Sequence, residues 1–168
     1  LTLGCEEPIE YTNLDYSIAE NQYLGYATTQ TIKVHPEGAE VSVFGGAVIL
    51  NFPEGSVSQP EVFIIGMLST DHLDVEGINI YETGFYLEAG SPYQELNEVT
   101  IQVKYDLDPE CWRMNPPEAE QDLSLNFVYP DFEGYQGMHP LGDCSVDSES
   151  KMIKSCIYNC GYFLVSEN

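Results

Sequence analysis

The sequence has very few basic residues. Five Lys and Arg stand against 28 Asp and Glu, so the formal net charge is −23 at pH 7. A surface this acidic repels phosphate backbones and anionic headgroups, which argues against nucleic acid and anionic membranes as partners. It favours solubility and the attraction of cations.

Long apolar runs and recognisable catalytic groupings are also absent. No stretch of about 18 apolar residues occurs, so we expect no transmembrane segment. The three histidines, His35, His72 and His139, lie far apart, and none belongs to a nucleophile elbow with Ser or Cys. We therefore expect surface histidines and no enzymatic activity.

The five cysteines lack the spacing of zinc sites, since no pair of Cys-x-x-Cys knuckles occurs. Disulfides fit better, and they predict an oxidising compartment such as the cell surface or the medium. Four of the cysteines allow three connectivities. The pairing that we favour joins Cys144 with Cys156 and Cys111 with Cys160.

The first 29 residues have no clean period of 2 or 3.6, although they contain four tyrosines. We interpret residues 1–29 as an arm or tether that precedes the folded domain. Leu1-Thr2-Leu3-Gly4-Cys5 is similar to the end of a bacterial lipoprotein signal, so Cys5 is a candidate lipid anchor. The alternatives for Cys5 are a disulfide partner or a free thiol.

Short alternating segments dominate residues 30–168. In the clearest one, Val99, Ile101, Val103 and Tyr105 fall on one face, with polar residues on the other. Such a segment predicts a strand with one buried face. About ten strands of this kind predict an all-β fold, an antiparallel β-sandwich.

Several other segments carry specific expectations. Residues 47–52 are apolar, lie between Gly45-Gly46 and a Pro53-x-Gly55 turn, and predict a core strand. Residues 30–34 and 40–44 alternate on either side of a turn, which predicts a hairpin. Residues 61–68 form a continuous apolar run, as expected where both faces of a strand are covered.

Two groups of residues are candidates for binding. Asp106, Asp108 and Glu110 place carboxylates at alternate positions of a loop, a spacing that suits calcium; the alternative is a solvated acidic loop. Tyr129, Phe132 and Tyr135 are candidates for an aromatic platform that binds a sugar or a protein. Their alternative role is ordinary packing in the core and rim of the sandwich.

Three parts of the chain together resemble a known family. They are Gly45-Gly46-x-Val48-x-Leu50-x-Phe52-Pro53-x-Gly55-Ser56-Val57, the block from Tyr86-Leu87-Glu88 to Tyr105, and the closing segment from Leu141 through Tyr162-Phe163-Leu164-Val165. Over residues 30–166 the chain resembles the β-sandwich domain shared by ankyrins, netrin receptors, zonula-occludens proteins and many bacterial surface proteins. The resemblance implies a β-sandwich that acts through contacts with other proteins.

The chain departs from that family at three places. The usual proline before the strand at Val99 is Glu98, and the usual tryptophan ahead of the last hairpin has no match near Met138. In self-cleaving relatives a His precedes the Ser or Thr nucleophile by two residues, where this chain has Cys160 and Tyr162. Because a phenol does not replace the aliphatic hydroxyl, we expect no self-cleavage.

Together these features predict a secreted or surface-anchored module without catalysis, which has a structural or adhesive role. Its partners would be other proteins, including copies of itself. One alternative is a subunit of an extracellular filament in which the arm adds a strand to a neighbour. Another alternative is a carbohydrate-binding module.

Overall fold

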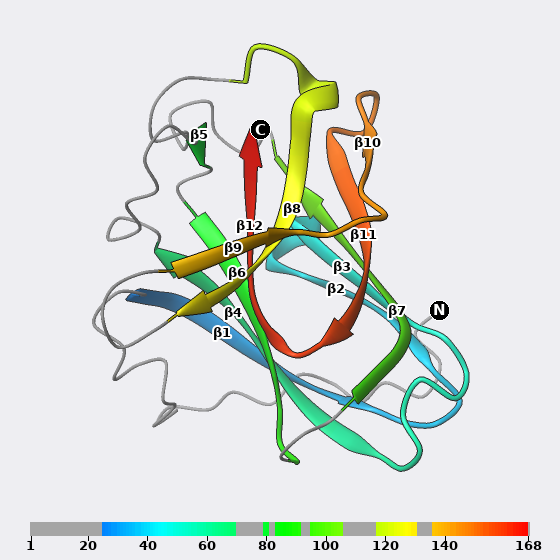
Figure 1. Ribbon diagram of the computed structural model, residues 1–168. Coiled ribbons are helices and arrows are strands. Elements are labelled where there is room, and N and C mark those ends of the chain that lie inside the picture. Colours follow the sequence, from blue (N-terminus) through cyan, green and yellow to red (C-terminus); the bar gives the residue numbers. More distant parts are fainter. Residues whose placement is uncertain are drawn as a thin grey trace.

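The computed structural model describes residues 25–69, 79–80, 83–91, 95–105, 117–130 and 136–167. This part of the chain is all-β and forms two antiparallel sheets, which confirms the predicted fold class (Figure 1). The strands are β1 (Gly25–Val34), β2 (Ala39–Val43), β3 (Val48–Phe52), β4 (Glu61–Ser69), β5 (Asn79–Ile80), β6 (Thr83–Ala89), β7 (Glu95–Lys104), β8 (Leu123–Pro130), β9 (Gln136–Pro140), β10 (Ser145–Asp147), β11 (Met152–Asn159) and β12 (Gly161–Glu167). Two short 3-10 turns are also present, η1 (Phe44–Gly46) and η3 (Glu120–Asp122).

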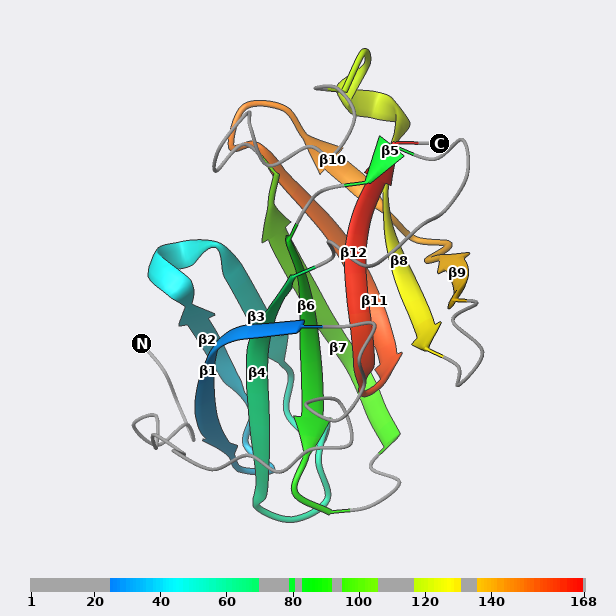
Figure 2. The same ribbon diagram turned by 90° about the vertical axis from the view of Figure 1, so that its left-hand side faces the viewer.

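The two sheets face each other. One has the strand order β1-β4-β6-β12-β8-β9, with the short β5 also paired to β12, and the other has the order β10-β11-β7-β3-β2. Figure 2 shows the first of these sheets in front of the second. The chain passes between the sheets repeatedly, so most neighbours within a sheet are distant in sequence.

The predicted hairpin of residues 30–34 with 40–44 is wrong. β1 pairs with β4, and β2 pairs with β3, so the turn between β1 and β2 carries the chain from one sheet to the other. In that turn the Gly38 amide donates to the His35 carbonyl at 2.9 Å, and Gly38 has a φ of 87°. The predicted turn is present, but it connects strands of different sheets.

The core lies between the sheets, and the apolar side chains of β7 point into it. Val99, Ile101, Val103 and Tyr105 are all buried, as predicted. β3 confirms the expectation for residues 47–52, because Val48, Leu50 and Phe52 are buried and β3 lies between β2 and β7. Gly45 and Gly46 precede it with φ values of 67° and 90°, a conformation that glycine adopts at little cost.

The sheet that contains β1 is buried on its outer face as well. Ile64, Tyr86 and Leu164 are buried, yet they do not belong to the cluster between the sheets. On this face Asn126 donates from Nδ2 to the Leu164 carbonyl and to Ser166 Oγ, at 3.3 and 2.8 Å. The continuous apolar run of β4 therefore has the environment that the sequence predicts.

The described fold begins earlier than the predicted domain boundary. β1 starts at Gly25 and pairs with β4 from there, whereas the sequence places the arm up to residue 29. Residues 25–29 thus belong to the sandwich. The remainder of the predicted arm lies outside the described residues.

Candidate functional site

A row of large side chains crosses the inner face of the sheet that contains β1, near the β11–β12 connection. Residues directly opposite each other on neighbouring strands share a face. The pairing register therefore aligns five residues across β4, β6, β12, β8 and β9, in the order Met67, Phe85, Phe163, Phe127 and His139. Phe85 and Phe163 are buried, Phe127 is half-buried and His139 is exposed, so the row runs from the core to the surface.

A pocket opens where this row reaches the surface. Its volume is about 290 Å³. We call it the β9–β11 pocket, and its lining residues are Phe127, His139, Pro140, Leu141, Ile157, Tyr158, Asn159 and Phe163. The lining is predominantly apolar and aromatic, with the amide of Asn159 and the imidazole of His139 as polar groups, a composition typical of ligand sites.

Packing around Gly161 sets one wall of the pocket. Phe127 and Phe163 make an edge-to-face contact with ring centroids 5.4 Å apart. A Cβ on Gly161 would lie 2.5 Å from Cζ of Phe127, so the Phe127 ring occupies the space that a side chain would need. Gly161 therefore permits the position of this aromatic wall.

The opposite wall belongs to the end of β11. Tyr158 is 58% exposed, and it is the exposed large hydrophobic residue that stands out in the part of the chain the structure describes. β10 pairs with β11 only at residues 152–154. The segment Ser155–Asn159, which we call the open edge, has β7 on one side and no described strand on the other.

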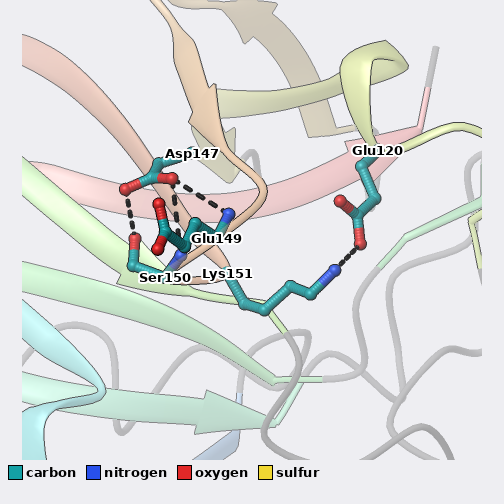
Figure 3. A network of polar contacts seen from close by, with 5 residues as sticks. All are labelled: Glu120, Asp147, Glu149, Ser150 and Lys151. Carbon is teal, nitrogen blue, oxygen red and sulfur yellow. Dashed lines mark hydrogen bonds and ion pairs between the residues drawn. The ribbon is translucent and has the colours of Figure 1, made fainter.

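Polar contacts fix the other end of β11 (Figure 3). The Asp147 carboxylate accepts from Ser150 Oγ at 2.6 Å and from the Glu149 amide at 3.0 Å, which closes the β10–β11 turn. These hydrogen bonds, chiefly that of the Ser150 hydroxyl, lower the pKa of Asp147. Lys151 pairs with Glu120 and so connects this turn to η3. The hydrogen bond from Lys151 is the main cause of the lowered pKa of Glu120.

A second group of titratable residues lies around the β11–β12 connection. The pKa of Cys160 is raised to about 12, mainly by burial, with a smaller contribution from the negative charges of Glu61 and Glu88. Burial likewise raises the pKa of Tyr162, and that of Glu88. Cys160 is therefore a neutral thiol near pH 7, a state unsuited to nucleophilic attack.

The structure does not join Cys144 to Cys156, and Cys111, the partner predicted for Cys160, lies outside the described residues. Cys144, Cys156 and Cys160 are free thiols. Cys144 Sγ lies between the sheets, 3.3 Å from the Leu125 amide, whereas Cys156 lies between Ser155 and Ile157, both of which are buried. Strand alternation thus turns Cys156 to the outer face of its sheet, away from Cys144.

The other predicted site residues are not placed by the structure. Asp106, Asp108, Glu110, Cys111, Phe132, Tyr135 and Cys5 lie outside the described residues. Tyr129 lies on β8 opposite Gly137 of β9, close in sequence to Phe127 of the pocket. The calcium loop and the aromatic platform therefore stay predictions.

Within the described ranges, no group of three or more His, Cys, Asp and Glu side chains is arranged to hold a metal ion. No helix among these residues is long and apolar enough to cross a membrane. No family profile and no curated protein matches the sequence.

Proposed function

We propose that this chain is a non-catalytic module of the cell exterior or cell surface, which binds other proteins through the side of the sandwich that carries the β9–β11 pocket. The observation that carries the proposal is the position of this pocket directly beside the open edge. The resemblance to the β-sandwich domains of surface proteins supports the extracellular part of the proposal. Attachment through a lipid on Cys5 belongs to the same proposal.

The exposure of Tyr158 favours a binding role for this surface. Tyrosine is enriched at protein interfaces because it combines a large apolar ring with a polar hydroxyl. Tyr158 is 58% exposed beside an apolar pocket, so an isolated chain leaves this area in water. A partner that covers the ring and fills the pocket would gain the free energy of burying both.

A peptide-display selection on the full chain tests the proposal. Peptides enriched on the wild type should bind the Tyr158→Ala variant at least about tenfold more weakly, as expected for the loss of an interface hot spot. Lys154→Ala is the matched control, because Lys154 is exposed on the same strand but does not line the pocket. Failure to enrich any peptide that Tyr158→Ala weakens would contradict the proposal.

The aromatic lining of the same pocket favours carbohydrate binding as a second candidate, since sugar rings stack on exposed aromatic side chains. A glycan array separates the two candidates. Hits that disappear with Tyr158→Ala would establish the carbohydrate function, and an array without hits would remove it.

A further inference from the structure

The open edge lacks the charges and prolines that guard many sheet edges. Natural sheets protect their edges with charges, prolines, bulges or very short strands. β10 has three residues, β9 ends at Pro140, β2 carries the exposed Glu40, and β1 shifts register between Tyr26 and Thr28. Ser155-Cys156-Ile157-Tyr158-Asn159 contains no charged residue and no proline, and its pairing with β7 shifts register between Ile157 and Asn159.

The gap in pairing is specific to this half of β11. Figure 1 shows β10 beside the beginning of β11 only, and the register ends at Lys154. On the opposite side, pairing with β7 extends to Asn159, with a shift in register between Ile157 and Asn159. A strand edge of this kind presents backbone N–H and C=O groups that can pair with a further strand.

The open edge and the pocket share three residues. Ile157, Tyr158 and Asn159 belong to both. Alternate side chains of a strand point to the same face, so a strand laid along the open edge would direct every second side chain toward the pocket. Backbone hydrogen bonds would supply affinity, and the pocket would select the side chain.

The pocket accepts an apolar side chain. Phe127, Leu141 and Phe163 supply apolar walls, and the volume is about 290 Å³. A cavity of roughly 150 Å³ lined by similar residues holds benzene. The pocket therefore has room for the side chain of Leu or Phe, and Asn159 is the exposed polar residue of β11 in its lining.

The charge of the chain selects the sequence around that side chain. A net charge of −23 generates a negative potential that attracts cationic segments and repels acidic ones. The potential is screened by salt over about 10 Å at 0.1 M ionic strength.

We infer that the open edge accepts an extended segment of a partner protein as an added strand, with one Leu or Phe in the β9–β11 pocket and Lys or Arg on either side. This inference rests on the proposed function and adds the mode of binding and the class of partner.

Synthetic peptides of alternating Thr and Lys, with Leu at the centre, are the probe. Fluorescence anisotropy with the full chain should show binding that weakens at least about tenfold when Leu is replaced by Asp, because a carboxylate would lose water on entering a predominantly apolar pocket. Replacing Lys by Glu should abolish binding. Raising NaCl from about 0.05 to about 0.5 M should weaken it.

Backbone methylation tests the added strand itself. One edge of a bound strand pairs with β11 while the other faces solvent, so methylating the amides at alternate positions gives two unequal peptides. One should lose binding at least about tenfold and the other should retain it. Equal loss or no loss in the two peptides would contradict strand addition.

Hydrogen exchange on the protein gives the second readout. Saturating peptide should slow amide exchange within Ser155–Asn159, and the pocket-filling variant Asn159→Trp should abolish both the binding and the protection. Lys154→Ala should change neither by more than about twofold. Circular dichroism on each variant separates loss of the site from loss of the fold.

The outcomes also distinguish the inference from the function on which it rests. Selected peptides that bind at Tyr158 without protecting the open edge would overturn strand addition and leave the protein-binding function standing. Peptides that require acidic or neutral sequences would overturn the charge requirement. Absence of any peptide binding would overturn both.

Discussion

At Gly66 on β4, a single added methyl group should test how tightly the two neighbouring strands β4 and β6 are packed. Gly66 is paired with Tyr86 on β6, whose ring lies over the glycine and is 1% exposed. A Cβ on Gly66 would lie 2.6 Å from Cζ and 2.8 Å from Cδ1 of Tyr86. Because these atoms belong to a rigid, buried ring, Gly66→Ala must displace Tyr86 from its site.

Two effects of opposite sign determine how much Gly66→Ala changes the free energy of unfolding. Alanine reduces the conformational entropy lost on folding, which stabilises by about 0.5–1 kcal/mol relative to glycine. Overpacking of a well-packed site costs about 1–3 kcal/mol. Since the ring has no exposed side into which to turn, we expect the second effect to dominate and the free energy of unfolding to fall by about 1–2 kcal/mol.

Equilibrium urea unfolding measures this change, provided that the slope with denaturant stays constant. Removing the ring should relieve the clash, so the double variant Gly66→Ala/Tyr86→Ala should be more stable than additivity predicts by about 0.5–3 kcal/mol. Gly142→Ala is the matched control, because a Cβ there meets no atom within 4 Å. A Gly66→Ala variant as stable as the wild type would refute the packing argument.

Three further predictions concern single side chains. Glu98 has a φ of 57°, which proline cannot adopt, so Glu98→Pro should lower the free energy of unfolding by more than about 1 kcal/mol, whereas Glu98→Gly should not lower it. Burial raises the pKa of Glu88 above its ordinary value of 4.5, so the ionised carboxylate destabilises the fold at neutral pH. The Glu88→Gln variant should therefore have the larger free energy of unfolding at pH 7. The difference from the wild type should shrink as the pH falls through the raised pKa toward 4.5. The pKa of Cys160 rises from 9.0 to about 12, so residue-resolved alkylation at pH 8 should be about 1000-fold slower in the folded chain than in urea; rates within tenfold would contradict its burial.

The strands were the predictable part of this fold. Hydrophobic alternation in residues 99–105 and the apolar run in 61–68 identify β7 and β4 because burial imposes these patterns whatever the neighbouring strand is. The same patterns do not identify which strands pair with each other. The turn at 35–38 shows that the chain reverses, but the same turn chemistry serves a hairpin and a change of sheet, and the structure has the latter.

The pocket was the unpredictable part. Its lining comes from residue 127, from 139–141 and from 157–163, so only the fold brings it together. β9 has Gly137 and Pro140 within five residues, a composition that gives no strand signal. The sequence pointed instead to Tyr129, which shares β8 with Phe127. His139 is exposed as predicted, but its place at the pocket mouth depends on its pairing opposite Phe127.

Two glycines show how one packing device serves both stability and the candidate site. Tyr86 lies over Gly66 and Phe127 lies over Gly161, each ring on a strand adjacent to its glycine. Tyr86 is fully buried, so its contact only fills the sheet, whereas Phe127 is half-buried and its exposed side lines the β9–β11 pocket. At Gly161 the space left by the absent side chain therefore determines where the aromatic wall stands. The chain needs glycine at that position for the shape of the pocket as well as for the packing of β8 against β12.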